Sequence, residues 1–260
     1  MKGGIVLVTY VVANRKGGVG KSTTSAALFN WLERSGKRTV LIDLDSQCNV
    51  SYAFGVDVAA DPDIATIADV FSGKMGIGDV VQPTHTVYGK IVPAAEILVD
   101  YDNGTEKINV NLKTALKTVE NDFDYCVLDA PPSLGRLTVS AMLAADQLII
   151  PALADIFSVQ GLNSMVKILE SVRQYNDITV AGILLTRNND RLILTKALTE
   201  MLDDVASEMG SKVFKSSIRE GVAVREAMAQ QIGLFEYDSA LRSNVAKDYD
   251  AFIRELMGVK

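Results

Sequence analysis

The chain has 260 residues, 48% apolar and 22% charged, so it can bury the core of an α/β domain. No segment reaches the roughly 18 apolar residues of a membrane helix. A net charge of −6 disfavours a surface that is basic throughout, although a local basic patch is compatible with it. Cys48 and Cys126 lack the spacing of a zinc site or a disulfide framework, so we expect a cytoplasmic protein.

The first predicted elements surround a glycine-rich loop. Ile5 to Ala13 is an almost unbroken apolar run, which is typical of a buried parallel strand. The loop that follows is Lys16-Gly17-Gly18-Val19-Gly20-Lys21-Ser22-Thr23, and helical spacing then continues to about Gly36. The sequence thus predicts a strand, a tight loop and a helix in succession.

Strand-like and helix-like segments alternate along the rest of the chain. We predict strands at 39–43, 90–99, 125–129, 148–151 and 178–186, and helices at 64–71, 108–119, 137–144, 159–172, 192–209, 222–229 and 240–257. Strands separated by helices indicate right-handed crossovers and a parallel sheet. Since no linker or repeat interrupts the pattern, we expect one domain over residues 1–260.

The glycine-rich loop has the composition of a phosphate-binding loop. A strand, such a loop and a helix N-terminus together direct backbone N–H groups and the helix dipole at phosphate oxygens. Lys21 is placed to reach the terminal phosphates, and the Ser22 hydroxyl to bind Mg²⁺. The predicted fold class is therefore α/β, a single-domain P-loop NTPase whose mostly parallel twisted sheet carries helices on both faces.

Three predicted strand ends carry polar groups suited to a nucleotide site. They are residues 14–22, 43–49 and 129–133, which include Asp43, Asp45 and Asp129. Ligands of parallel sheets bind at the carboxyl ends of the strands, so these groups should converge. A single carboxylate there is as consistent with a turn or a cap as with a ligand, but three beside a phosphate loop favour a site.

At these residues the chain resembles the ParA family of partition ATPases, in the deviant Walker A group of P-loop proteins. KGGVGKST at 16–23 matches the deviant Walker A motif, LIDLDSQCNVS at 41–51 is similar to the second motif, and CVLDAPPSLG at 126–135 to the Walker B segment. LIIPALAD at 148–155, VFKSSIREGVAVREA at 213–227 and EYDSALRSNVAKDY at 236–249 resemble further family blocks. The resemblance extends nearly end to end, to the short Soj-like form without an N-terminal helix-turn-helix domain.

The resemblance implies an ATP and Mg²⁺ site with assigned roles. The loop Gly17, Gly18, Val19, Gly20, Lys21, Ser22 and Thr23 would bind the phosphates, with Lys21 on the β- and γ-phosphates and Thr23 on the α-phosphate. Ser22 would coordinate Mg²⁺, with Asp43 supporting the metal shell and Asp129 holding a metal-bound water. Asp45 would orient the attacking water.

The same resemblance gives Lys16 a role in the partner subunit. It would reach across a nucleotide-sandwich homodimer and neutralise phosphate charge, which suits a reaction that depends on positioning and charge stabilisation. If Lys16 has no such role, it is an ordinary solvated lysine.

The chain departs from the family pattern at two places. Ser46 and Cys48 replace the usual proline and glycine, so the loop after Asp45 is expected to differ in conformation. Ala223 stands where the family has a DNA-contacting arginine, leaving Arg191, Arg219 and Arg225 as candidate DNA contacts. A solvated helix face is an equally good interpretation of these arginines.

Base preference can also be argued. Guanine-specific relatives carry a Thr-Lys-x-Asp motif, whereas Asn189 follows Thr186-Arg187 here, which favours adenine. Asp190 is one residue away, so a shifted register is compatible with guanine.

The leading functional hypothesis is an ATP hydrolase that segregates a plasmid, mobile element or chromosome. ATP would promote dimerisation and nonspecific DNA binding on the nucleoid, and a ParB-like centromere-binding protein would stimulate hydrolysis. Because the loop begins at residue 16, we expect no sequence-specific repressor domain.

Two alternatives remain from other classes. A MinD-like ATPase would position a membrane-bound or protein cargo through an amphipathic C-terminal helix, but the polar face of residues 245–257 has mixed charge, so packing on the sheet and no stable membrane association are expected. An iron–sulfur ATPase needs cysteine ligands, which Cys48 and Cys126 do not supply.

Overall fold

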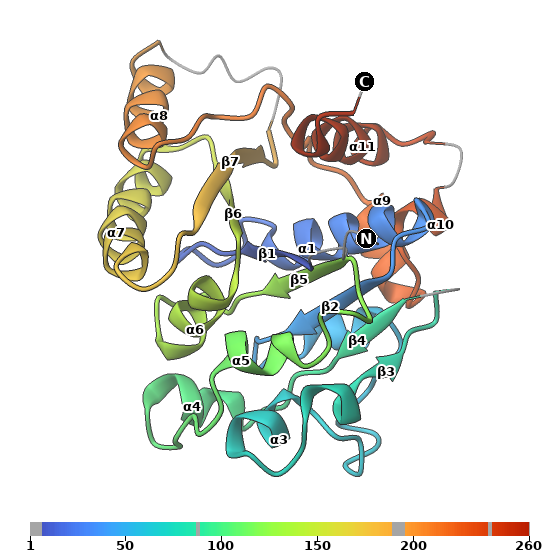
Figure 1. Ribbon diagram of the computed structural model, residues 1–260. Coiled ribbons are helices and arrows are strands. Elements are labelled where there is room, and N and C mark those ends of the chain that lie inside the picture. The colour runs from blue at the N-terminus through green and yellow to red at the C-terminus, as the bar shows by residue number, and fades with distance from the viewer. Residues whose placement is uncertain (1–6, 87–88, 189–195, 239–240, 260) are drawn as a thin grey trace, which may run out of the picture.

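The computed structural model describes residues 7–86, 89–188, 196–238 and 241–259, and these form a seven-stranded sheet between two layers of helices (Figure 1). The strands are β1 (Val8–Val12), β2 (Thr39–Asp43), β3 (Gln82–Pro83), β4 (Lys90–Val92), β5 (Tyr125–Asp129), β6 (Gln147–Leu153) and β7 (Thr179–Thr186). They are ordered β3-β4-β2-β5-β1-β6-β7, parallel except for the antiparallel pair β3 and β4.

The helices divide between the two faces of the sheet. α3 (Ile67–Ser72), α4 (Leu98–Asn103), α5 (Leu112–Lys117), α6 (Arg136–Ala144), α7 (Ile156–Arg173) and α8 (Lys196–Glu208) cover one face. α1 (Lys21–Arg34), α2 (Asn49–Ala53), α9 (Ala223–Ala229), α10 (Leu234–Tyr237) and α11 (Asn244–Met257) cover the other, and a short 3₁₀ helix spans Ile77–Val80. The predicted fold class is confirmed.

The apolar runs of the central strands follow from this layering. In β1, Val11 packs with the α3–α8 layer and Val12 with the α1 and α9–α11 layer, and both side chains are fully buried. In β5, Leu128 packs with the α3–α8 layer and Val127 with the α1 and α9–α11 layer. Successive side chains point to opposite faces, so a strand covered on both sides is apolar at every position.

Several elements are shorter than predicted, and two helices start later because an N-cap residue fixes where each begins. The helix predicted at 108–119 begins at Leu112, where the Asn111 side chain accepts hydrogen bonds from the backbone N–H groups of Lys113 and Thr114. The last helix begins at Asn244 because Ser243 caps it. The strand predicted at 90–99 ends at Val92, and part of that range belongs to α4.

Helix α11 packs its apolar face on the protein itself, as expected. Tyr249 and Phe252 are fully buried, and the Tyr249 and Thr24 hydroxyls are 3.3 Å apart. On the polar side, Trp31 Nε1 donates to Asp250 Oδ1 at 2.8 Å, which joins α1 to α11. Within the described ranges, no helix is both long and apolar enough to span a bilayer.

The sheet order places a ligand crevice at the end of β1. From β1 the chain crosses to β2 on one side, whereas after β5 it crosses to β6 on the other side of β1. Such a switch point leaves space at the carboxyl ends of the strands, because the two connections diverge there. Residues following β1, β2 and β5 therefore meet at one edge of the sheet.

Candidate nucleotide-binding site

The loop between β1 and α1 has a backbone suited to phosphate binding. Gly18 and Gly20 adopt left-handed conformations, with φ of 72° and 82°, which only glycine tolerates without strain. Gly20 is also the N-cap of α1, and no side chain caps this helix. Its first N–H groups are therefore available to an anion, at the positive end of the helix dipole.

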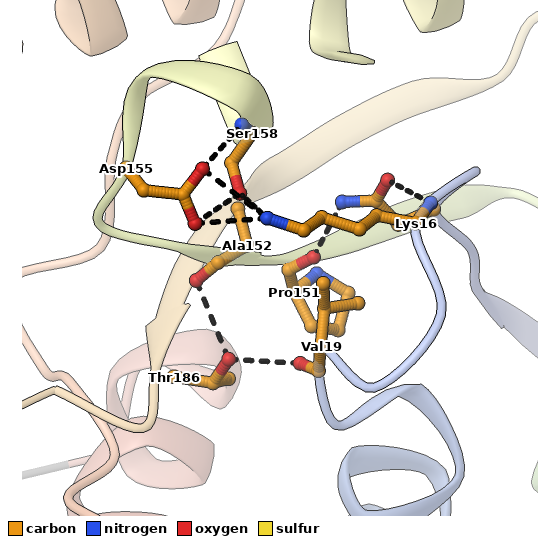
Figure 2. A network of polar contacts seen from close by, with 8 residues as sticks. Lys16, Val19, Pro151, Ala152, Asp155, Ser158 and Thr186 are labelled. Atoms are coloured by element: carbon orange, nitrogen blue, oxygen red, sulfur yellow. Dashed lines mark hydrogen bonds and ion pairs between the residues drawn. The ribbon is translucent and has the colours of Figure 1, made fainter.

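Asn14, just after β1, and Thr186, at the end of β7, hold this loop in place (Figure 2). The Thr186 hydroxyl contacts both Val19 O, at 2.8 Å, and Ala152 O, at 3.3 Å. Asn14 donates to Pro151 O at 2.7 Å and accepts from the backbone N–H of Lys16 at 3.0 Å. The phosphate loop is thus fixed to β6 and β7 before any ligand binds, which lowers the entropic cost of binding.

The loop opens onto a cavity of about 540 Å³. Its lining includes the loop and the β2 end: Gly17, Gly18, Gly20, Lys21, Ser22, Thr23 and Asp45. It also includes the aliphatic side chains Ile218, Val224, Met228 and Val245. A lining that combines phosphate-binding groups with apolar side chains is what a nucleotide requires.

Lys21 is a buried cation in the lining of this cavity. It is 6% exposed, and its Nζ donates to the backbone O of Lys16 at 3.1 Å. Burial lowers the pKa of Lys21, whereas the carboxylates of Asp129 and Asp45 oppose that shift. A phosphate group would supply the anionic partner that the carbonyl supplies only in part.

Asp129, at the end of β5, is a buried carboxylate with an unused oxygen. Its Oδ1 accepts from Ser25 Oγ at 2.7 Å, whereas Oδ2 has no hydrogen-bond partner among the described residues. Burial and then the charge of Asp43 raise its pKa, and hydrogen bonds from Ser25 and Ser22 oppose the rise. Such a carboxylate fits a Mg²⁺ site in which Ser22 is the direct ligand and Asp129 holds a metal-bound water.

Asp43 is the last residue of β2 and Asp45 lies two positions later, but their carboxylates have different surroundings. Asp43 is fully buried; its Oδ2 accepts from the backbone N–H and hydroxyl of Ser51, and its Oδ1 from the backbone N–H of Asp45. Asp45 lines the cavity, and its Oδ1 accepts from the backbone N–H of Gln47. This arrangement suits Asp43 to fixing the Asp45 turn rather than to contacting a metal.

Lys16 points away from the cavity in this structure. Its Nζ lies 2.9 Å from Asp155 Oδ2 and 3.3 Å from Ser158 Oγ, in the first turn of α7 (Figure 2). Partial burial raises the pKa of Asp155, but the hydrogen bonds from Lys16 and the Ser158 backbone outweigh it and hold the pKa below the usual range. Lys16 thus has an intramolecular partner.

Comparison with known proteins places this site in a family. Residues 8–181 match the family described as AAA domain. The chain is 30% identical to the chromosome-partitioning ATPase Soj of Treponema pallidum, over 96% of each chain. It is 33% identical to the chromosome partitioning protein ParA of Caulobacter vibrioides, over 85% of this chain and 84% of that one. The chain belongs to the ParA/Soj family of P-loop ATPases.

Solved structures share the fold of this chain. An ATP complex of a McdA variant from Cyanothece has a TM-score of 0.85 and 25% identity, over 99% of this chain and 98% of that one. The cell division ATPase MinD of Pyrococcus furiosus shares the fold, with a TM-score of 0.76 at 24% identity, over 96% and 98%.

The ParA/Soj motif departure after Asp45 has a visible consequence. Cys48 stands where the family motif has glycine, and it still adopts the left-handed backbone, with φ of 52°. Its N–H donates to Asp45 O at 2.9 Å, which closes the turn. The left-handed backbone at Cys48 costs a non-glycine residue about 1–2 kcal/mol of conformational free energy relative to glycine.

The arginines proposed for DNA contact have different surroundings. Arg219 makes a bidentate ion pair with Asp248 of α11, with its Nε and Nη2 at 2.9 and 2.6 Å, and its backbone N–H binds the same carboxylate. Arg225 is exposed and lines the nucleotide cavity. Ala223, 5% exposed, begins α9. Arg191 and the base-reading candidate Asn189 lie outside the described residues.

Sequence reasoning missed the residues that position the ParA/Soj site rather than contact its ligand. Asn14 lies in the predicted strand end at 14–22 and Thr186 in the base-preference motif, but neither was predicted to hold the loop, because a lone Asn or Thr at a strand end has no distinctive pattern. Asp155 carried a usable signal, since an acid directly before an apolar-periodic helix is typical of an N-cap, and its side chain does accept from the Ser158 backbone N–H. Cys126 is fully buried in β5, as expected of a structural thiol.

Proposed function

We propose that this chain hydrolyses ATP with Mg²⁺ and uses the cycle to segregate a DNA molecule in the cytoplasm. In the proposal the ATP-bound form is a nucleotide-sandwich homodimer that binds nonspecific DNA on the nucleoid, and a ParB-like partner stimulates hydrolysis. Relatives described as chromosome-partitioning proteins support the cellular role.

The observation that carries the proposal is the convergence of three strand ends on one cavity edge. The loop after β1 supplies N–H donors and Lys21 for the phosphates, with Ser22 as the metal ligand and Thr23 beside the α-phosphate. The loop after β2 places the Asp45 carboxylate in the same cavity, where it would orient the attacking water. Bound Mg²⁺ would neutralise phosphate charge, with Ser22 and Asp129 as its protein groups.

Dimerisation enters the proposal through Lys16. Phosphoryl transfer needs positive charge near the transferring phosphate, and Lys16 of one protomer is directed to Asp155 of its own chain rather than to its own cavity. A second copy would offer it a stronger anion, because a polyphosphate carries more charge than one carboxylate. We therefore propose that Lys16 acts on the nucleotide of the partner subunit.

ATP hydrolysis and DNA retardation together test the proposal. The purified protein is assayed for phosphate release with and without nonspecific duplex DNA, and for DNA retardation at low salt, where phosphate contacts are strongest. Lys21→Ala should abolish both activities, whereas Lys167→Ala, a change of equal charge on α7, should leave them intact. Absence of ATP-dependent retardation in the wild type contradicts the DNA role.

Positioning of a protein cargo is the second candidate, and the burial of the apolar face of α11 favours it over a membrane role. A MinD-like membrane anchor would need the apolar face of α11, which is buried: Tyr249 contacts Thr24 of α1, and the Phe252 ring packs against Phe214. The single Trp31 donates to Asp250 of α11, so its fluorescence reports on this contact. With ATP and anionic vesicles we expect unchanged Trp31 emission and no co-sedimentation; a change in both supports the membrane alternative.

A further inference from the structure

A second cavity lies directly behind the turn that carries Asp45. It is a groove of about 910 Å³ between the 46–49 turn, the start of α2, residues 56–62 and the segment before α4. Gln47 and Asn49 line both this groove and the nucleotide cavity. Residues 46–49 are therefore a thin wall between the two.

The groove combines apolar surface with negative charge. Tyr52 and Val99 line it and are 50% and 47% exposed, so part of its surface is apolar and open to a partner. Asp57 and Glu96 are also part of its lining, and none of the described lining residues is Lys or Arg. The field in the groove is thus negative.

The thiol of Cys48, in the 46–49 wall, is exposed to the negative field of the groove. Burial raises the pKa of its thiol to about 12, and the carboxylates of Asp43, Glu96, Asp45 and Asp57 add to the rise. Carboxylates from both cavities therefore raise the pKa of the same residue, Cys48.

The charge of the groove limits which ligands can bind in it. Asp57 and Glu96 repel DNA and anionic lipid and attract a cationic group. A free metal ion would make no use of the apolar surface of Tyr52 and Val99, whereas a peptide would. We propose that the groove binds a segment of a partner protein in which Lys or Arg side chains alternate with apolar ones, and that this segment controls the Asp45 turn.

The wall provides the route for control. Asp45 Oδ1 accepts from Gln47 N–H, and Asp45 O accepts from Cys48 N–H. A segment that presses on Gln47 or Cys48 displaces the backbone to which the Asp45 carboxylate is bound. This regulatory part rests on the proposed function of Asp45 in hydrolysis, whereas binding of the segment does not.

Binding is tested with the full chain and a fluorescein-labelled hexapeptide of alternating leucine and arginine. Fluorescence anisotropy should show binding that weakens at least about threefold in the Asp57→Asn/Glu96→Gln variant, since each exposed charge pair supplies up to about a factor of five. Asn at position 57 keeps the acceptor for the backbone N–H groups of Ala59 and Ala60.

Two controls separate the groove from general acidity. Asp203→Asn/Glu208→Gln removes the same charge from α8 and should leave peptide affinity unchanged. A leucine–glutamate hexapeptide should not bind. Equal weakening by both double variants, or equal binding of both peptides, overturns the proposal.

Location is tested by backbone hydrogen exchange, with the buried strand β5 as an internal reference. Saturating peptide should slow exchange in the 46–62 segment several-fold; an unchanged rate there places the peptide elsewhere and overturns the proposal. The peptide should also change the ATPase rate of the wild type. If the protein binds the peptide but hydrolyses no ATP, the proposed function fails while the groove stands as a binding site.

Discussion

The Nζ of Lys16 and the carboxylate of Asp155 form an ion pair of 2.9 Å between the phosphate loop and the first turn of α7. Asp155 also caps α7 by accepting from the Ser158 backbone N–H at 2.8 Å. One carboxylate thus stabilises a helix and holds the lysine that is proposed to act in the partner subunit. In the proposed dimer, a contact between Lys16 and nucleotide phosphate would replace this ion pair.

Asp155→Asn is expected to favour ATP-dependent dimerisation. Asn retains the helix cap but not the charge, so Lys16 is released while α7 stays intact. Both side chains are 34% exposed, and such a pair contributes about 0–1 kcal/mol, so the dimer dissociation constant should fall by at most about fivefold. Sedimentation velocity with ATP measures it, and a weaker dimer contradicts the prediction. Asp155→Ala, which also loses the cap, should lower stability by about 1 kcal/mol.

Lys16→Ala should bind ATP with nearly wild-type affinity but lose hydrolysis and dimerisation. The lysine contributes no atom to its own cavity, so only the partner's site is affected. Mixing Lys16→Ala with Lys21→Ala protein gives a second test, since a mixed dimer pairs an intact loop with an intact Lys16 and should recover part of the activity. Normal hydrolysis by Lys16→Ala alone would show that Lys16 serves only its ion pair with Asp155.

Mg²⁺-dependent nucleotide binding should weaken as the pH falls. Burial raises the pKa of Asp129 to about 7, and the metal site needs the ionised carboxylate. Between pH 8 and pH 6 the Mg²⁺-dependent affinity should fall about tenfold, measured by calorimetry. Asp129→Asn should be weak at both values and retain only the pH dependence of the nucleotide itself; an equally steep profile in that variant would show that another group titrates.

The apo protein should respond to pH in the opposite sense. A buried carboxylate with a raised pKa favours the folded state below its unfolded-state pKa, and that contribution is lost as the pH rises toward 7. Urea unfolding of the wild type should therefore show a loss of stability over this range that is smaller in Asp129→Asn.

Arg219→Lys should destabilise the fold almost as much as Arg219→Ala. The planar guanidinium makes two hydrogen bonds to Asp248, whose side chain is 11% exposed, and a lysine cannot reproduce this bidentate geometry. We expect a loss of about 1–2 kcal/mol in urea unfolding. Arg225→Ala, on the exposed surface, should leave stability within about 0.5 kcal/mol of the wild type. Weaker DNA binding in Arg219→Lys at unchanged stability would instead support a direct DNA contact.

Cys48→Gly should be tolerated and Cys48→Val should not. Glycine adopts the left-handed backbone at position 48 without strain, which offsets the loss of the small thiol, whereas a β-branched side chain at φ of 52° is strongly disfavoured. Thermal unfolding should rank Gly at or above the wild type and Val at least about 1 kcal/mol below it. The reverse order would show that side-chain packing outweighs backbone strain at this turn.

The sequence by itself determined the fold class and the phosphate-binding loop. The strands at 39–43 and 125–129 were predicted with their observed bounds because buried parallel strands are short, apolar and closed by polar residues. Gly18, Gly20 and Lys21 were recognisable because phosphate binding imposes backbone and charge requirements on consecutive residues. These are local properties, so one stretch of chain expresses them.

Only the tertiary structure decided which partners the chosen residues have. Lys16 meets Asp155 and Arg219 meets Asp248 across 139 and 29 positions of the chain, and no local pattern encodes such pairs. The 46–49 wall, in which Gln47 and Asn49 line both cavities, likewise exists only because the turn after β2 lies between two cavities in the folded chain. Contacts between distant residues depend on how the layers pack, and packing is a property of the whole fold.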